Sequence, residues 1–454
     1  MTLSQRRCLY IVALTILPIC TQSAELALSG DIGVGRSGNV QRVSSGGSSD
    51  NIETLGVQFA VLQDSDRYSL NLLGDLAGYR YANRTYNDQL SGTANGSAAL
   101  HIIPEALSWV VEDNFGQARR DLFTVVTPIN SENINYFSTG PDISLRFDAN
   151  MRLLAHLRYG RVDYELSPYG TDDYEALVGL ERNLSSSSTL SLDLSDRHVV
   201  PEQASGSPKY DSERAFIRYS VRGSVTTAGL DVGASRLVEY NKTDTGPLIL
   251  ATVTRKLSGY SSVTLQAGRE YTDAAGALAT TTGAPALTAI SNLTAVGGSG
   301  VLAITQSATP YVHNFGQLSL NMDGLRTHVR FGLSGADDRY LGQAQLDRKT
   351  YAATGIVTRA LTPKLTIRVD GSYTRNEFQT RSNDYREASG ILSLNWAVGR
   401  LLSLQLSGEE YRYSSSGAGN SVTEPRVWLK LTYGQRALRQ FAPSRAQFAS
   451  FATN

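Results

Sequence analysis

The chain has 454 residues, and its 42 Lys and Arg balance its 42 Asp and Glu, so its formal net charge is zero. A chain without a basic excess is not typical of a nucleic-acid-binding protein, and 41% hydrophobic residues with 13 Pro exclude a disordered chain or a collagen. No apolar run of about 18 residues follows Cys20, so a helical membrane protein is excluded as well.

Residues 1–24 are predicted to be an export signal. Arg6 and Arg7 precede the apolar residues 8–20 (CLYIVALTILPIC), which are too few for a membrane-spanning helix and suit the core of a signal peptide. Ala24 supplies the small residue expected before a cleavage site, and a buried N-terminal helix is the alternative. Both cysteines lie in this segment, so the mature chain has no cysteine for disulfides, thiol catalysis or metal binding.

From residue 25 on, apolar and polar residues alternate with period two. Leu190, Leu192 and Leu194 enclose Ser191 and Asp193. The same pattern returns at residues 55–61, 365–369, 402–406 and 427–433. Alternation of this kind predicts β-strands with one apolar and one polar face. Segments of about ten alternating residues between turn residues are typical of the wall of a transmembrane barrel.

Short breaks separate these strands at a regular interval. They fall near Ser65, Pro104, Ala149, Ser186, Ser224, Gly259, Asp323, Thr362 and Gly399. Nine short turns predict ten hairpins, and therefore an all-β, antiparallel up-and-down barrel of about 20 strands (roughly 18–22) with its short turns in the periplasm. A multi-domain β-sandwich or a β-propeller is the soluble alternative, but a propeller repeat has four strands rather than two.

Two motifs recur at the strand ends. Three short turns share the pattern R-x-L-[ST], at residues 182–185, 255–258 and 359–362. Tyrosines end strands on the opposite side, at Tyr81, Tyr164, Tyr240, Tyr271, Tyr373 and Tyr411. Tyrosine at this place predicts an aromatic girdle facing the membrane interface.

The central part of the chain resembles a known family. The resemblance is carried by residues 108–117 (SWVVEDNFGQ), 128–135 (PINSENIN), 145–147 (LRF) and 158–160 (RYG), and the R-x-L-[ST] turns are also similar. The family is the group of outer-membrane β-barrels associated with exosortase (PEP-CTERM) and exopolysaccharide loci, and related β-barrel porins. The resemblance implies a role in surface polysaccharide or protein sorting, with export machinery as a partner, and it implies no catalytic residues.

Alternation also predicts which charged residues face the lumen. The arginines expected there, opposite lipid-facing neighbours, are Arg146, Arg152, Arg158, Arg218, Arg222, Arg330 and Arg368. Guanidinium groups suit carboxylate, sulfate or phosphate, so these side chains are candidates to meet an anionic chain. Asp75, Asp193, Asp231 and Asp370 are expected on the same face, and a mixed-charge ladder that only solvates the wall is the alternative.

Other candidate chemistry is weaker. The sequence GVGRSG at residues 33–38 fits a dinucleotide motif but lacks the helix that the motif requires. The five histidines have no paired spacing, and His156 is the first to test for catalysis. Asp172-Asp173 and Asp337-Asp338, in expected outer loops, are carboxylates of the kind that Ca²⁺ binds. Solvated charges are the alternative, and we expect no cofactor, no metal and no enzymatic activity.

Residues 274–310 lengthen one hairpin and contain no Lys, Arg, Asp or Glu. A barrel of about 20 strands needs something to limit its aqueous channel, and this segment is predicted to be a constriction loop or gate. An outer hairpin or a partner-binding surface is the alternative. The expected organisation is therefore a signal peptide (1–24), a barrel (25–433, with the inserted loop 274–310) and a C-terminal tail (434–454).

The sequence thus predicts a barrel in the outer membrane of a Gram-negative bacterium, inserted by the barrel-assembly machinery and surrounded by lipid and lipopolysaccharide. Its expected role is to pass or organise surface polysaccharide, with an anionic chain as the cargo. A general diffusion porin is the first alternative, and a barrel enzyme acting on lipid or glycan is the second. No nucleic acid is expected as a partner.

Overall fold

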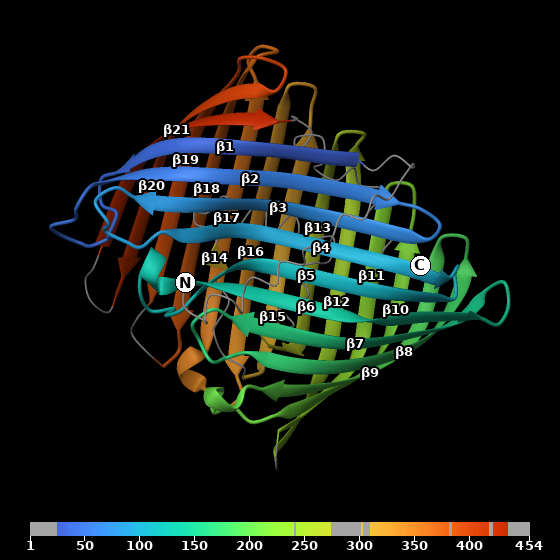
Figure 1. The fold of residues 1–454 in the computed structure, drawn as a ribbon. Coiled ribbons are helices and arrows are strands. Elements are labelled where there is room, and N and C mark those ends of the chain that lie inside the picture. Colours follow the sequence, from blue (N-terminus) through green and yellow to red (C-terminus); the bar gives the residue numbers. More distant parts are fainter. Residues whose placement is uncertain are drawn as a thin grey trace.

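The computed structural model describes residues 25–239, 242–273, 301–302, 309–380, 384–416 and 421–434. These residues form one sheet that closes on itself, and its pairings are antiparallel except for that of the short β14 (Figure 1). The strands are β1 (Glu25–Ser37), β2 (Asp50–Asp64), β3 (Tyr68–Tyr81), β4 (Gln89–Ile103), β5 (Leu107–Arg119), β6 (Ser131–Arg146), β7 (Met151–Tyr164), β8 (Thr171–Ser185), β9 (Ser188–Pro201), β10 (Tyr210–Arg222), β11 (Thr226–Glu239), β12 (Lys242–Ser258), β13 (Ser261–Thr272), β14 (Val301–Leu302), β15 (Tyr311–Asp323), β16 (Thr327–Tyr340), β17 (Arg348–Ala360), β18 (Leu365–Phe378), β19 (Tyr385–Ala397), β20 (Leu402–Ser415) and β21 (Ser421–Gly434).

The barrel closes through β1, which pairs with β2 on one side and with β21 on the other. β14 is not one of the strands of the wall. β13 pairs directly with β15, and β14 pairs instead in parallel with Gln117 and Ala118 of β5. The 21-stranded sheet less β14 leaves a wall of 20 strands, which confirms the predicted number. Closure leaves no unpaired sheet edge, as a transmembrane barrel requires.

All nine predicted short turns lie at one end of the barrel. They are residues 65–67, 104–106, 147–150, 186–187, 223–225, 259–260, 324–326, 361–364 and 398–401. Glu25 and Gly434 lie at this same end, and most of the connections at the opposite end are longer. Short turns belong to the periplasmic side of such barrels and long loops to the outer side, so these ends are called the inner and the outer end.

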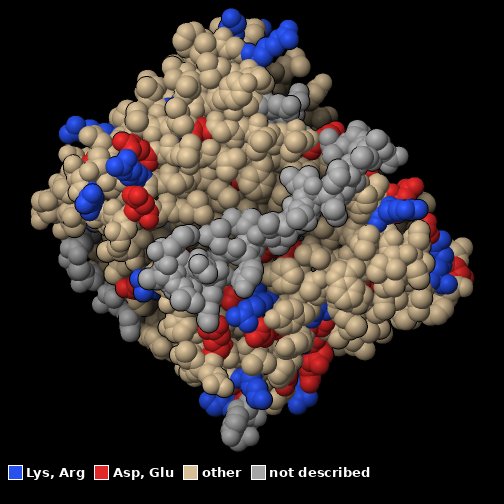
Figure 2. Space-filling model, viewed as in Figure 1, with Lys and Arg blue, Asp and Glu red and all other residues tan. Residues whose placement is uncertain are grey.

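Alternation along each strand separates an apolar exterior from a polar lumen. Leu192 is 52% exposed on the outside, whereas Asp193 is 3% exposed on the lumen side. In the face shown in Figure 2, a broad tan area carries few blue or red atoms. No helix among the described residues is long and apolar enough to cross a membrane. An apolar belt around a closed, polar-lined barrel is the arrangement of an outer-membrane protein. The chain is an outer-membrane β-barrel.

Buried apolar side chains gather inside the outer half of the barrel. Three clusters are built from residues near the outer strand ends: Val40, Ile52, Tyr81 and Trp428; Val199, Tyr210, Leu237, Tyr271 and Val312; and Leu122, Phe378, Tyr385, Tyr411, Tyr413 and Val422. The predicted aromatic girdle is therefore wrong for Tyr81, Tyr271 and Tyr411, which pack inside the barrel, and for Tyr164, whose hydroxyl is buried on the lumen side of β7. Tyr373 does face outward, and Tyr240 lies outside the described residues. A tyrosine at a strand end fits either environment, because its ring is apolar and its hydroxyl polar.

Candidate functional site: the lumen and its crossing segment

The seven arginines predicted for the lumen all occupy lumen-facing positions. Arg218 lies between the exposed, outward residues Ile217 and Tyr219. Each of the other arginines likewise alternates with outward-facing residues of its strand. They lie on β6 (Arg146), β7 (Arg152, Arg158), β10 (Arg218, Arg222), β16 (Arg330) and β18 (Arg368). They are spread around the wall rather than gathered at one point.

Five of these arginines have a carboxylate partner. The nitrogen–oxygen distances are 3.5 Å for Arg146–Glu105, 2.7 Å for Arg152–Glu181, 2.5 Å for Arg158–Asp142, 3.0 Å for Arg218–Asp231 and 2.7 Å for Arg368–Asp370. Arg330 has no ion pair with a described residue. The described lumen is thus a ladder of paired opposite charges, and a role in attracting anions stays a prediction.

A row of polar side chains crosses four adjacent strands on the lumen side. Ser108 of β5 pairs in register with His101 of β4 and with Asp142 of β6, which pairs in turn with His156 of β7. The His101 Nδ1 atom lies 2.9 Å from Ser108 Oγ, and the His156 Nδ1 atom lies 2.7 Å from Asp142 Oδ1. We call His101, Ser108, Asp142 and His156 the lumen row.

The lumen row does not assemble a catalytic triad among the described contacts. Asp142 orients His156, but no described serine hydroxyl bonds to His156, and no described carboxylate bonds to His101. A nucleophile, a base and an orienting acid must be linked in sequence for acyl transfer. The row instead offers hydrogen-bond donors and acceptors side by side.

The acidic pairs considered for Ca²⁺ bond to arginines or histidine instead. Asp173 accepts from Arg197 at 2.8 Å, and Asp338 lies 3.1 Å from Arg348 and 2.6 Å from His313. Both pairs lie in strands, at the outer ends of β8 and β16, rather than in loops. No group of three or more His, Cys, Asp or Glu placed to hold a metal occurs in the described part of the chain.

The connection between β5 and β6, residues 120–130, folds into the barrel, and we call it the crossing segment. Leu122 is buried against Phe378, Tyr385, Tyr411, Tyr413 and Val422, which belong to β18–β21. On the shorter way round the wall, β20, β21, β1, β2, β3 and β4 separate β19 from β5. Contact between residues so far apart on the wall requires the segment to cross the interior of the barrel.

Two buried ion pairs hold the crossing segment in place. Arg119, at the end of β5, donates to both carboxylate oxygens of Glu387 on β19, at 2.6 and 2.8 Å. Tyr411 also donates to Glu387, at 2.8 Å. Arg42, from the loop between β1 and β2, donates to Glu424 at 2.6 Å and to the carbonyl oxygen of Val126 at 2.5 Å. The segment is therefore fastened to the opposite wall and to a second loop.

Asn130 gives the crossing segment its internal shape. Its side-chain oxygen accepts from the backbone N–H of Asp121 at 2.7 Å, and its amide nitrogen donates to the carbonyl oxygens of Asp121 and Val125 at 3.0 and 3.1 Å. Thr127 accepts from the Asn130 N–H and begins the short 3₁₀ helix η2 (Pro128–Asn130). These bonds satisfy backbone groups that the missing sheet partners would leave unpaired.

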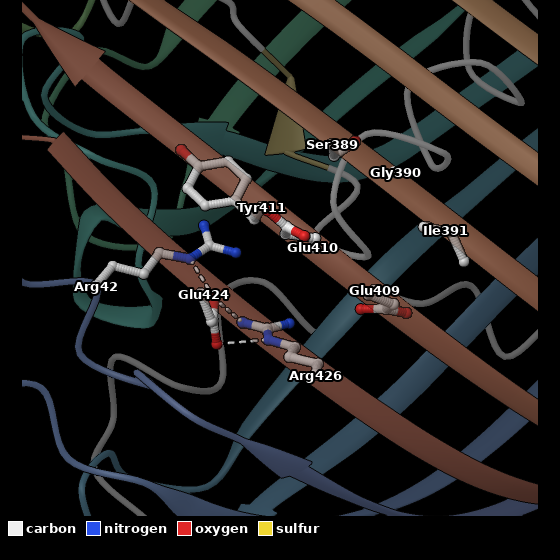
Figure 3. A pocket seen from close by; sticks show the side chains of 9 residues that line it. All are labelled: Arg42, Ser389, Gly390, Ile391, Glu409, Glu410, Tyr411, Glu424 and Arg426. Atoms are coloured by element: carbon white, nitrogen blue, oxygen red, sulfur yellow. Dashed lines mark hydrogen bonds and ion pairs between the residues drawn. The ribbon is translucent and has the colours of Figure 1, made fainter.

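A small hollow lies on the lumen side of β19–β21, beside the Arg42 anchor (Figure 3). It is too narrow to hold a water molecule. Figure 3 shows Glu424 between Arg42 and Arg426, while Glu409 and Ile391 stand further along the wall. The Arg42 guanidinium lies 3.8 Å from the centre of the Tyr411 ring, a cation–π contact. Both carboxylate oxygens of Glu424 accept hydrogen bonds, which come from Ser37, Arg42 and Arg426.

The crossing segment was not expected from the sequence, which indicated residues 274–310 as the constriction. Most of residues 274–310 lie outside the described residues, so that prediction stays open, and β14 shows only that Val301–Leu302 pairs beside the base of the crossing segment. A signal was available in residues 122–126 (LFTVV), an apolar run within an expected outer loop. Such a run needs burial, and the lumen provides it.

No family model matches the sequence, and no curated protein matches it. Among solved structures, a variant of the ferric enterobactin receptor PfeA of Pseudomonas aeruginosa is 10% identical, with a TM-score of 0.43 over 91% of this chain and 81% of that chain. The siderophore receptor PirA of Acinetobacter baumannii is 7% identical, with a TM-score of 0.45 over 91% and 81%. The FrpB iron transporter of Neisseria meningitidis is 10% identical, with a TM-score of 0.45 over 90% and 81%. At such identities the likeness is one of barrel architecture alone.

Proposed function

We propose that this barrel is a channel for polar solutes across the outer membrane and that the crossing segment sets its width. The observation that carries this proposal is the fastening of residues 120–130 to the opposite wall by the Arg119–Glu387 pair. Barrels of 16–18 strands already leave an aqueous channel, so a wall of 20 strands needs an internal constriction if passage is to be selective.

We propose carbohydrate as the cargo class, in the form of a surface polysaccharide. The lumen row and Arg158 offer donors and acceptors over four adjacent strands, and a sugar hydroxyl is at once a donor and an acceptor. The resemblance of residues 108–117 and 128–135 to barrels of exopolysaccharide loci supports the same cargo. Export machinery is then the expected partner in the cell.

General diffusion is the second candidate. It is favoured by the pairing of five lumen arginines with carboxylates, because a balanced ladder attracts neither anions nor cations strongly. The two candidates differ in a measurable way. A carbohydrate channel binds its cargo and is transiently blocked by it, whereas a diffusion porin passes small solutes in proportion to their size.

The test is single-channel recording of the purified full chain in planar bilayers. Replacing residues 121–129 with Gly and Ser of equal length should raise the conductance, because the apolar anchor at Leu122 is lost. The same exchange at residues 203–208, in the exposed β9–β10 connection, is the matched control and should leave the conductance unchanged. Equal conductance of the two variants would reject the constriction, and absence of any conductance would reject the channel.

Added oligosaccharides then separate the two cargo candidates. Short-lived current blocks that depend on oligosaccharide concentration, together with loss of surface polysaccharide on gene deletion, are expected for a carbohydrate channel. Unblocked current and an intact polysaccharide layer would favour general diffusion.

A further inference from the structure

The three R-x-L-[ST] motifs occupy equivalent places in the barrel. Each lies where a strand reaches the inner end: the arginines are Arg182 on β8, Arg255 on β12 and Arg359 on β17. The Ser or Thr that ends each motif shapes the turn. Ser185 Oγ, Ser258 Oγ and Thr362 Oγ1 each accept a backbone N–H from two residues further along the chain, at 3.2 Å. The turn thus explains the last residue of the motif but not the arginine.

The three arginines point outward, to the lipid side. Each is exposed, and the residue two positions before it is an exposed, outward Leu180, Val253 or Val357. Their partners in register on the following strand are Leu190, Val263 and Ile367, which are apolar. None of the three arginines has an ion pair or a side-chain hydrogen bond with a described residue. They contrast with the paired arginines of the lumen.

Their depth matches the inner boundary of the membrane. On β8 and β17 the outward tyrosines Tyr174 and Tyr351 each stand eight residues before the arginine. Eight residues at 3.3 Å, tilted by about 40°, span about 20 Å along the membrane normal. Tyrosine thus marks the outer boundary of the apolar belt, and arginine marks the inner one. A cation at that boundary extends its head group into the polar layer and leaves its stem in lipid.

We propose that Arg182, Arg255 and Arg359 each bind the phosphate group of a phospholipid in the periplasmic leaflet. The guanidinium fork presents paired N–H donors that match phosphate oxygens, and it is always charged. The wall itself supplies no acceptor to these groups among the described residues. The apolar partners Leu190, Val263 and Ile367 on the following strands suit contact with acyl chains.

The three positions form separate contacts rather than one site. Three wall strands lie between β8 and β12, and three between β12 and β17, because β14 is not part of the wall, so each arginine is four strand spacings from the next. At about 4.8 Å between strands and a tilt of about 40°, the arginines are roughly 25 Å apart around the barrel. Each therefore holds its own lipid, and together they fix the height of the barrel in the membrane. This inference does not depend on what the lumen carries.

The test measures lipids retained by the purified full chain. The variant carries Arg182→Gln, Arg255→Gln and Arg359→Gln, and phosphatidylglycerol is the probe in native mass spectrometry. The control variant carries Lys209→Gln, Lys349→Gln and Arg386→Gln, which remove the same charge from exposed, unpaired positions toward the outer end. We expect the parent and the control to retain the lipid, and the triple arginine variant to bind it roughly tenfold more weakly. Heat-modifiable gel mobility shows that all three proteins are folded.

A second variant separates charge from geometry. Changing the three arginines to Lys keeps the charge but loses the fork, so intermediate lipid binding is expected. Lipid retention by the Gln variant equal to that of the parent would overturn the proposal. Complete displacement of the lipid by inorganic phosphate alone would also overturn it. So would a Gln variant that no longer binds a periplasmic acidic protein but binds lipid as well as the parent does.

Discussion

The lumen arginines differ in how closely each is paired with a carboxylate and in how far its side chain is buried. Arg152 and Arg158 each lie within hydrogen-bond distance of a carboxylate, with side chains largely buried, whereas Arg146 reaches Glu105 only at 3.5 Å and is mostly exposed. Partly buried pairs are less screened by salt than exposed ones. The anion-facing role predicted for these residues therefore depends on how far each carboxylate offsets its arginine.

Neutralising the three arginines together tests that role. In the Arg146→Gln, Arg152→Gln, Arg158→Gln variant, Glu105, Glu181 and Asp142 lose their partners, so the local lumen charge becomes negative. We expect the channel to shift toward cation preference, measured as a change in reversal potential in a salt gradient. The Lys209→Gln, Lys349→Gln, Arg386→Gln protein is the control. An unchanged reversal potential would leave these arginines with a structural role only.

The crossing segment is an element that depends on a few strong contacts. Arg119 and Glu387 have side chains only 3% and 9% exposed, so each charge relies on the other. Removing one partner of a buried pair costs about 3–5 kcal/mol, whereas replacing both with apolar residues is often neutral. The fastening is therefore sensitive to single changes in a way that the hydrogen-bonded wall is not.

Arg119→Gln should release the crossing segment while the wall stays folded. The expected result is faster proteolytic cleavage within residues 120–130 and larger fluctuations of the single-channel current, since Glu387 loses its charged partner and keeps, among the described residues, the hydrogen bond from the Tyr411 hydroxyl. The Arg119→Met, Glu387→Met double variant should restore protection. Arg386→Gln, beside Glu387 in sequence but facing outward, is the control. Equal cleavage of the single variant and the parent would show that the apolar packing of Leu122 suffices.

At the scale of the whole molecule, successive residues of each strand face lipid and the lumen in turn. Leu318 of β15 faces lipid, and its neighbour Ser319 faces the lumen beside Gly332. A one-residue shift of any strand would exchange these faces. Continuous pairing around 20 strands therefore fixes the exterior and the lumen together.

Leu318→Arg and Ser319→Arg form a matched pair that tests this register. Charge on the lipid face near the midplane costs about 2–4 kcal/mol, and charge in the lumen costs little. We expect Leu318→Arg to reduce the fraction of folded, heat-modifiable protein in the outer membrane and Ser319→Arg to leave it near the parent level. Similar losses in both variants would contradict the assignment of faces.

Local patterns were enough to predict the wall. Alternation in residues such as 190–194 shows which face of a strand is apolar, and short turns such as those at Pro104 and Gly399 divide the chain into hairpins. Both depend on near neighbours, because each wall strand pairs with the wall strand that follows it in the chain, except at the β1–β21 closure; β14, which pairs with β5, is not part of the wall. The number of strands, the two faces and the lumen positions of the seven arginines follow from these patterns.

The contents of the lumen were decided by contacts that exist only once the barrel has closed. Arg119 meets Glu387 across 268 residues of chain, and Arg42 meets Glu424 across 382. Alternation does not indicate which arginine takes which carboxylate, whether Tyr411 turns to the lumen or to lipid, or which outer loop enters. Those choices depend on the shape and charge of a wall brought together from both ends of the chain, and no local pattern contains that shape.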